Sequence, residues 1–274
     1  MSAIPERLPQ HTRLRSSAPI TAGHYEVRMA SSAWEIREAQ RLRYRLLYLE
    51  RGGRPDAEKT QTEADADEWD ENAYHVIVVD RRDAAERVVG TLRMVAAADL
   101  QDGQRFYTEQ AFDLTRLRQR YDRLLELGRF CIDGTRRQGT ILLLIWKFAA
   151  QFIVDNEIDV MLGCASFPGT NLADHEQILG YLHRHNRASP ELMPTPRVVD
   201  YVQLAQFEDP TLEFDNATRK LPTLLRGYLK LGARVSDTAI IDPVFNTVFV
   251  CIYVTAHDML EGNTPLVQSK HRNS

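Results

Sequence analysis

Hydrophobic residues recur along the chain with two periods, one typical of helices and one typical of strands. Over residues 33–50 the apolar positions lie three or four residues apart, which predicts an amphipathic helix (Ala39, Leu42, Leu46 and Leu49). Ser32 precedes this stretch and Glu35 follows three residues later, as in a capping box. One face of the predicted helix is therefore expected to pack against a core.

Runs rich in β-branched residues predict strands. Residues 75–80 and 88–95 are two such runs joined by a charged turn, which predicts an antiparallel hairpin. Further strands are predicted over 124–132, 160–166 and as a pair within 239–254, helices over 112–122, 141–156 and 173–186, and a helix or a strand over 224–231. Because strands occur on both sides of a helix-bearing middle, we expect an α/β (α+β) fold, a single domain with a mixed central sheet flanked by helices.

Polar segments separate these elements and set the expected domain limits. Residues 54–71 are acidic and predict a mobile loop, and residues 187–222 predict an irregular, proline-containing insertion. Prolines and arginines near the start predict a flexible N-terminal tail over 1–27, and residues 261–274 a C-terminal tail. The folded domain is expected to span residues 28–260.

Composition narrows the classes of function. The chain has 274 residues with a net charge of −4, which argues against nucleic-acid binding, where a strongly basic domain is expected. Its three cysteines form no CxxC pair, so we expect neither a disulfide framework nor a metal site. The longest apolar stretch, residues 141–154, is shorter than the roughly 20 residues that cross a bilayer. No signal peptide is recognisable, so a cytoplasmic protein is expected, with peripheral contact at the inner membrane face as an open alternative.

The segment from Glu126 to Thr140 is the most informative part of the sequence. A predicted strand runs into a short loop with glycines, and a predicted helix starts at once. The first amides of a helix lack partners and attract an anion, and Gly139 lets a ligand approach the backbone closely. The spacing of glycines fits neither a Walker loop nor a dinucleotide loop. The segment predicts a phosphate or pyrophosphate site, and the alternative is a charged connection without a ligand.

The loop resembles the R/Q-x-x-G-x-G/A signature of the GCN5-related N-acetyltransferase superfamily. In that superfamily the loop amides hold the pyrophosphate of coenzyme A or the phosphopantetheine of an acyl carrier protein. The resemblance therefore implies a donor-binding site at five consecutive residues: Arg136, Arg137, Gln138, Gly139 and Thr140. Thr140 departs from the usual small residue.

Longer motifs resemble one branch of this superfamily, the L-ornithine N-alpha-acyltransferases that make lyso-ornithine lipid. The motifs span about residues 30–255 and are Arg41-Leu-Arg-Tyr-Arg45, Gly90-Thr-Leu-Arg93, Glu126-Leu-Gly-Arg129, Gly163-Cys-Ala-Ser-Phe-Pro-Gly169, Leu225-Arg-Gly-Tyr-Leu-Lys-Leu-Gly-Ala233 and Asp242-Pro-Val-Phe-Asn-Thr247. Phe130 replaces the Ser or Ala expected after Glu-Leu-Gly-Arg.

The sequence is similar also to the acyl-homoserine-lactone synthases, a sister branch. Their functional pattern falls here on Arg43, Asp67, Asp70, Arg93, Glu126 and Arg129. The resemblance implies that Glu126, beside Arg129, accepts the proton of the attacking amine; the alternative is that Glu126 only pairs with an arginine. Arg43 and Arg93 are expected to hold the acceptor's carboxylate, and Asp67 and Asp70 its side-chain ammonium.

A regular strand puts residues three apart on opposite faces, so a site shared by Glu126 and Arg129 requires a bulge near Gly128. Tyr228 is a candidate proton donor to the leaving thiolate. His175 and Cys131 are expected to be structural. A run of arginines would suit an acidic partner, although such a run is usually just a solvated face (Arg116, Arg118, Arg120 and Arg123).

The resemblance implies an N-acyltransferase that moves a (3-hydroxy)acyl chain to the alpha-amine of L-ornithine by direct attack on a thioester. An acyl carrier protein is the expected donor and partner, a coenzyme A thioester is the alternative donor, and no tightly bound cofactor is expected. An acyl-homoserine-lactone synthase, another N-acyl amino acid synthase and a non-enzymatic binding module are the competing hypotheses.

Overall fold

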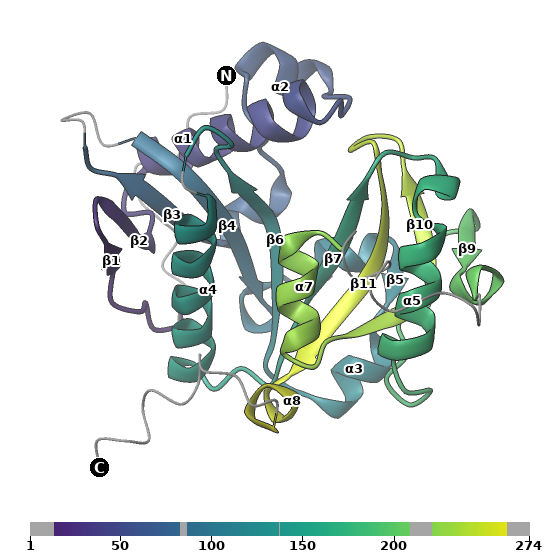
Figure 1. Ribbon diagram of the computed structural model, residues 1–274. Coiled ribbons are helices and arrows are strands. Elements are labelled where there is room, and N and C mark those ends of the chain that lie inside the picture. The colour runs from purple at the N-terminus through teal and green to yellow at the C-terminus, as the bar shows by residue number, and fades with distance from the viewer. Residues whose placement is uncertain (1–13, 83–86, 137, 209–220, 262–274) are drawn as a thin grey trace. The chain divides into compact units, whose positions relative to one another are not determined.

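A computed structural model describes residues 14–82, 87–136, 138–208 and 221–261 (Figure 1). The chain divides into two compact units. Unit 1 comprises the described residues up to Gln104 together with Leu127–Ile158, and unit 2 comprises Arg105–Glu126 and the described residues from Asp159 onward. The predicted domain limits stay a prediction, and residues 1–13, 137, 209–220 and 262–274 lie outside the described part.

The sheet of unit 1 has the strand order β1-β2-β3-β4-β6. Its strands are β1 (Ile20–Ala22), β2 (Tyr25–Met29), β3 (Tyr74–Asp80), β4 (Arg87–Ala96) and the part of β6 (Leu124–Ile132) from Leu127 onward. The antiparallel pairing of β3 with β4 confirms the predicted hairpin. The pairing of β1 with β2 was not predicted, since this stretch was assigned to the flexible tail. The reason is that Tyr25 and Val27 are buried and β2 packs against α4 (Gln138–Asp155).

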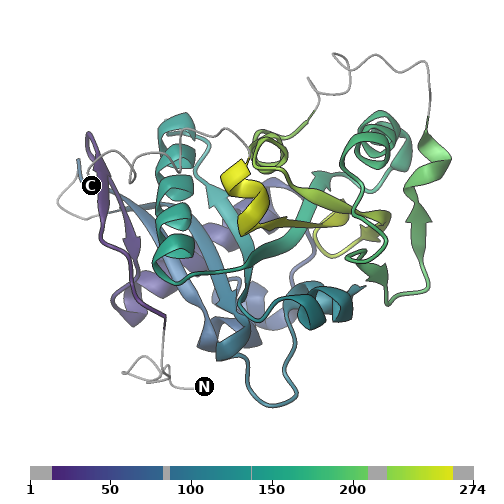
Figure 2. The same cartoon turned by 90° about the horizontal axis from the view of Figure 1, so that it is seen from below.

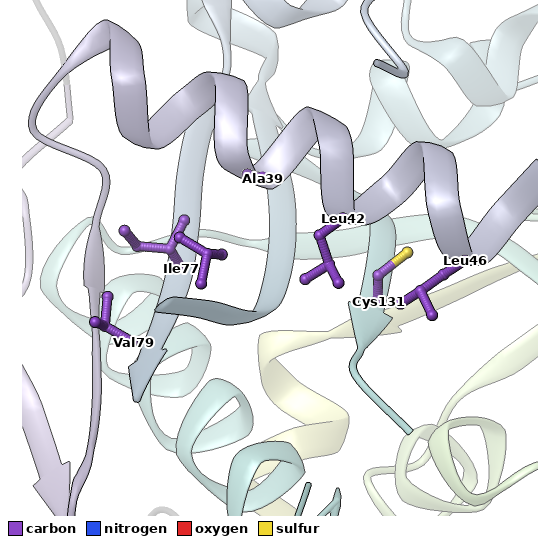
Figure 3. Close-up of a cluster of buried hydrophobic side chains, with 7 residues drawn as sticks. Ala39, Leu42, Leu46, Ile77, Val79 and Cys131 are labelled. Carbon is purple, nitrogen blue, oxygen red and sulfur yellow. The ribbon is translucent and has the colours of Figure 1, made fainter. Parts of the chain in front are cut away.

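Two helices cover the two faces of this sheet. Helix α1 (Ala33–Tyr44) continues as a π-helical stretch, η1 (Arg45–Glu50), and its apolar residues pack on Ile77 and Val79 of β3 (Figure 3). The Ser32 side chain accepts a hydrogen bond from the Glu35 amide, so the predicted N-cap is confirmed. Helix α4 packs against β1 to β4, beside the β1–β2 hairpin in Figures 1 and 2. A Cβ on Gly90 of β4 would lie 2.8 Å from Ile141 of α4, so this close packing requires glycine.

The acidic stretch 54–71 is not a simple loop. It contains α2 (Ala57–Thr62) and a 3₁₀ turn, η2 (Glu68–Asn72), and each begins at an aspartate, Asp56 or Asp67, whose side chain accepts a backbone N–H bond. The prediction of a loop without regular structure was wrong because some of its acidic side chains cap these turns, while Asp65 is fully buried. Its charge is compensated by arginines from α1 and β6.

Unit 2 has the strand order β6-β7-β11-β10-β9. Leu124, Leu125 and Glu126 of β6 pair in parallel with β7 (Val160–Pro168), while β11 (Thr247–Thr255), β10 (Arg234–Asp242) and β9 (Tyr201–Gln203) are antiparallel. The helices are α3 (Thr115–Arg120), α5 (Glu176–Asn186), α7 (Thr223–Lys230) and α8 (Ala256–Glu261), and a small second sheet pairs β5 (Phe112–Asp113) with β8 (Thr195–Pro196). The mixed parallel and antiparallel pairing confirms the predicted α+β class, and α7 resolves the ambiguous segment as a helix.

The predicted insertion over 187–222 contains short ordered elements in its described part. They are β8, β9 and a 3₁₀ turn, η6 (Leu204–Phe207), and η6 packs on α5. Further 3₁₀ turns are η3 (Ala97–Asp99), η4 (Tyr107–Gln110) and η5 (Leu172–Asp174). No helix among the described residues is both long enough and apolar enough to cross a lipid bilayer.

Candidate active site

Three arginines and three aspartates of unit 1 form one hydrogen-bonded cluster. Arg43 comes from α1, Arg93 from β4 and Arg129 from β6, whereas the aspartates lie in or beside η2 (Asp65, Asp67 and Asp70). Asp70 receives Arg43 Nη2 at 2.6 Å and Arg93 Nη1 at 3.1 Å, and Arg93 also binds Asp67. Arg129 donates from Nε to Asp65 at 2.8 Å and from Nη2 to Asp67 at 2.9 Å. The structure thus brings together five of the six residues in the predicted pattern and adds Asp65.

The members of this cluster differ in exposure. The Arg43 and Asp65 side chains are 0% exposed, whereas those of Arg129 and Asp67 are 9% and 12% exposed. Burial alone would raise the pKa of Asp65, but the neighbouring Arg129 and Arg43 outweigh it and hold that pKa below its usual range. In the same way Arg43 and Arg93 outweigh burial at Asp70 and keep its pKa low. All three arginines therefore face ionised carboxylates.

The backbone of Arg129 departs from that of a regular strand. Its φ is +53°, in the left-handed region that non-glycine residues rarely adopt. A conformation of this kind costs of order 1–3 kcal/mol and persists where surrounding contacts hold it, often at functional sites. Here the two bonds to Asp65 and Asp67 hold the side chain. The irregularity that the sequence predicts near Gly128 falls on the next residue.

Glu126 belongs to unit 2 and has a different environment. It is buried, with 4% of its surface exposed, and its carboxylate accepts the backbone N–H of Tyr107 at 3.0 Å and of Thr108 at 2.7 Å. These amides begin η4, where helical amides lack partners within the turn. The two bonds fix the position of both carboxylate oxygens. No sequence pattern predicts this contact, because residues 107 and 108 lie 18 or 19 positions before Glu126 along the chain and belong to no recognised motif.

The predicted donor loop begins after β6 with a buried aspartate. Asp133 is fully buried; it accepts the Thr135 amide at 3.0 Å and forms ion pairs with Arg45 and Arg87 at 3.1 and 3.4 Å. These contacts fix the turn that leads into α4. Sequence reasoning missed Asp133, although an Asp two residues before a Thr in a glycine-containing loop is a common turn signal.

Helix α4 starts at Gln138, three residues before the predicted start at residue 141. Gly139 is exposed, and a Cβ placed on it would meet no neighbouring atom of the described residues within 4 Å, so open space lies beside this backbone. Arg136 forms an ion pair with Asp80 at 3.4 Å. Thr140 is half-buried, and Arg137 lies outside the described residues. The first turn of α4 therefore has room for a ligand.

Comparison with known proteins identifies the chain's relatives. Residues 42–147 match the acetyltransferase (GNAT) domain family. The L-ornithine N(alpha)-acyltransferase of Rhodobacter capsulatus is 35% identical over 260 residues, which cover 94% of this chain and 95% of that protein. The chain belongs to the L-ornithine N(alpha)-acyltransferase family. A second relative of that name, from Agrobacterium fabrum, is 32% identical over 84% of this chain and 80% of its own.

A solved structure of FeeM, an N-acyl amino acid synthase from uncultured soil microbes, is similar at 12% identity with a TM-score of 0.44. The match covers 89% of this chain and 96% of FeeM.

Three further residues that the sequence singles out pack within the fold of this L-ornithine N(alpha)-acyltransferase family member: His175, Cys131 and Tyr228. His175 is buried against Phe167, with Nε2 3.1 Å from the Gly169 carbonyl oxygen. Cys131 lies in the core beneath α1, where burial raises its thiol pKa to about 11. Burial also raises the pKa of Tyr228, so its phenol keeps its proton at neutral pH.

The predicted arginine run is largely paired within unit 2. Arg118 binds Glu109 through Nε and Nη2 at 2.9 and 2.6 Å, and Arg123 pairs with Asp159 at 3.3 Å. Arg116 donates to the carbonyl of Pro190. Three of the four arginines in this run therefore have hydrogen-bond or ion-pair partners within unit 2.

His75 lies beside the charged cluster of this family member. Its Nε2 is 3.0 Å from the Asp70 carbonyl oxygen and, as a donor to it, carries the proton. Burial lowers the pKa of His75 from an ordinary 6.5 to about 4, so the ring is neutral at pH 7.

His75 predicts a loss of stability in mild acid. Between pH 6.5 and 4 the unfolded chain binds a proton at this residue that the folded chain does not bind. The free energy of unfolding is therefore expected to fall by about 2 kcal/mol from pH 6.5 to pH 5 through this group alone. Urea unfolding at both pH values measures it, with His75→Gln as control because glutamine can donate to the same carbonyl without titrating. An equal pH dependence in both proteins would contradict the prediction.

Proposed function

We propose that this protein is an N-acyltransferase that moves a (3-hydroxy)acyl chain from an acyl carrier protein thioester to the alpha-amine of L-ornithine. The observation that carries this proposal is the 35% identity to the Rhodobacter capsulatus L-ornithine N(alpha)-acyltransferase over nearly the full length of both chains. The product is lyso-ornithine lipid, and a cytoplasmic location with peripheral contact at the inner membrane face suits a lipid product.

The charged cluster suits an amino acid with a second ammonium group. L-Ornithine carries one carboxylate and two amines, so its recognition requires both a cation and an anion. Arg129 and Asp67 are the more exposed members, and we assign the direct contacts with the acceptor to them. Arg43, Asp70 and Arg93 are more buried and mutually paired, so within this proposal they position the other two.

Glu126 is the proposed acceptor of the amine proton. The amine nitrogen attacks the thioester carbonyl carbon, the N–C bond forms as the proton passes to the carboxylate, and the C–S bond then breaks to release the thiolate. An alpha-amine has a pKa near 8, so a fraction of it is already neutral near neutral pH. The carboxylate then has only to accept the proton that the neutral amine releases as it attacks. The bonds from Tyr107 and Thr108 hold the carboxylate in one orientation, which removes the entropic cost of placing the base.

The donor's phosphorylated arm is assigned to the first turn of α4. The free amides and dipole of a helix N-terminus favour a phosphate, and the open space beside Gly139 allows close approach. The predicted set is Arg136, Arg137, Gln138, Gly139 and Thr140, of which Arg136 would have to exchange its contact with Asp80 for the ligand. An acyl carrier protein and coenzyme A share this arm, so the loop suits either donor.

An acylation assay tests the proposal. The purified protein is incubated with L-ornithine and a 3-hydroxyacyl thioester of either acyl carrier protein or coenzyme A, and N-acyl-ornithine is measured by mass spectrometry. Product with the carrier-protein donor is expected. Activity only with S-adenosylmethionine as acceptor would instead indicate an acyl-homoserine-lactone synthase, and no product with either donor would contradict the proposal.

Gly139→Ala tests the donor site separately. The added methyl group meets no protein atom, and alanine favours a helix over glycine by about 1 kcal/mol, so stability should be unchanged or higher. The KM for the acyl donor is expected to rise about tenfold, since roughly 1.4 kcal/mol is lost where the phosphate approaches the backbone. Lys147→Ala, at an exposed position of the same helix, should leave this KM unchanged. Equal donor KM values for the two variants would remove the loop from the donor site.

A further inference from the structure

Two cysteines of unit 2 lie directly opposite each other on neighbouring strands. Cys164 of β7 is the register partner of Cys251 of β11, in a continuous antiparallel ladder that runs from Val160 to Pro168 (Figure 1). Neither cysteine is disulfide-bonded in this structure. Directly opposite residues point their side chains to the same face of a sheet. The two sulfurs therefore belong to the same side of these strands.

The hydrogen-bond pattern shows which kind of antiparallel pair they form. The Cys251 amide donates to Ser236 Oγ of β10 at 3.1 Å, on the side of β11 away from β7. The N–H and C=O of an extended residue point to the same strand edge, so neither backbone group of Cys251 faces β7. The Gly169 amide donates to the Asn246 carbonyl at 2.8 Å, so Gly169 and Asn246 are a hydrogen-bonded pair of the same ladder. Hydrogen-bonded and non-hydrogen-bonded pairs alternate along an antiparallel ladder, and Cys164 lies five residues before Gly169. The alternation therefore also makes Cys164 and Cys251 a non-hydrogen-bonded pair.

This pair type brings two cysteines close enough to be bridged. Opposite Cα atoms are about 4.5 Å apart at non-hydrogen-bonded positions and about 5.5 Å apart at hydrogen-bonded ones. Disulfides span Cα separations of roughly 4.4–6.8 Å, so the expected spacing lies at the short end of this range. Cysteines at this spacing can be bridged without moving the backbone, and thiol–disulfide exchange with a dithiol opens such a bridge again. The geometry thus suits a reversible bond.

The surroundings connect this pair to Glu126. Cys164 Sγ lies 3.6 Å from Thr108 Oγ, and the amide of Thr108 donates to the Glu126 carboxylate. Cys164 is partly exposed, whereas Cys251 is fully buried. A bridge would draw the Cys164 sulfur toward β11 and break its contact with Thr108.

We propose that Cys164 and Cys251 form a reversible cross-strand disulfide when a hydroperoxide oxidises them. Peroxide first converts the Cys164 thiol to a sulfenic acid and is reduced to water. The Cys251 sulfur then attacks the sulfenic sulfur, the S–S bond forms, and a second water leaves. Two thiols lose two electrons and two protons in all, and a dithiol such as dithiothreitol reverses the reaction.

The order of these steps follows from exposure. Burial, with the neighbouring Cys164 and Glu126, raises the pKa of Cys251, so this thiol is a poor first target. The more exposed Cys164 meets the oxidant first, and Cys251 resolves the product. Bridge formation should accelerate as the pH rises, because thiolates are the reactive species.

Peptide mapping of the full-length protein tests the bridge. After treatment with hydrogen peroxide, free thiols are blocked with N-ethylmaleimide and the protein is digested without reductant. A peptide linking Cys164 to Cys251 is expected, and it should disappear after dithiothreitol. Cys131→Ser should keep the linked peptide, and Cys251→Ala should abolish it. Maleimide adducts on both residues after peroxide would overturn the proposal, and this readout on the unmutated chain does not depend on how the variants fold.

The consequence for catalysis rests on the proposed function and has its own readout. Acyl transfer by the oxidised protein is expected to fall several-fold, in proportion to the linked fraction, and to recover with dithiothreitol. Full activity in a fully linked sample would overturn the connection to Glu126. Failure of the acylation assay itself leaves the peptide map as an independent measurement.

Discussion

Asp70→Ala is expected to destabilise the protein by about 3–5 kcal/mol, because it leaves buried arginines without their shared carboxylate. Asp70 receives Arg43 at 2.6 and 3.1 Å, Arg93 at 3.1 Å and the Gln40 side chain at 3.0 Å. Arg43 is 0% exposed, so water cannot replace these bonds without opening the structure. Urea unfolding at pH 7 measures the loss.

Asp67→Ala is the matched control. This aspartate carries the same charge and contacts the same cluster, but it is the most exposed of the three and does not pair with the fully buried Arg43. Its substitution should cost only about 1–2 kcal/mol, while the KM for L-ornithine should rise because Asp67 is a proposed acceptor contact. If Asp70→Ala and Asp67→Ala lower the free energy of unfolding equally, then burial does not distinguish the residues that position the cluster from those that contact L-ornithine.

The charged cluster of three arginines and three aspartates shows which site residues the sequence can predict and which it cannot. The resemblance named Arg43, Asp67, Asp70 and Arg93, and the structure brings these four together with Arg129. The sequence predicts acceptor contacts at Arg43, Arg93, Asp67 and Asp70, whereas burial leads us to propose Asp67 and Arg129 as the direct contacts. Asp65 is not singled out by the sequence because it is one of eight acids within residues 54–71, and only tertiary packing decides which acid of such a stretch is buried. A hydrophobic pattern cannot predict a buried charge whose compensation comes from distant elements.

The strands and helices were easier to predict than the segments between them. β6 and α4 have long apolar runs, and the structure places them at Leu124–Ile132 and Gln138–Asp155, close to the predicted ranges. The β1–β2 hairpin was missed because its strands are short and polar residues interrupt them, so its pairing depends on β3 and α4. The positive φ of Arg129 is likewise imposed from outside, by the carboxylates that hold its side chain.

Glu126→Gln is expected to lower kcat for ornithine acylation by about 10²–10⁴-fold, the usual contribution of a general base. Glutamine keeps the shape and one acceptor oxygen, so one of the two amides from Tyr107 and Thr108 stays satisfied. The donor KM should change little, since the donor's arm is assigned to α4. Steady-state kinetics with L-ornithine and the acyl donor measure both quantities.

Glu109→Gln separates this chemical role from a structural one. Glu109 is also buried and also accepts a backbone amide at the start of η4, that of the N-cap residue Phe106 at 2.9 Å; in addition it pairs with Arg118. Losing the charge of Glu109 should cost about 1–3 kcal/mol of stability, because its bonds to Arg118 weaken, without lowering kcat by orders of magnitude. If both substitutions lower kcat equally, then Glu126 only anchors η4, and the proton of the amine must pass to another group.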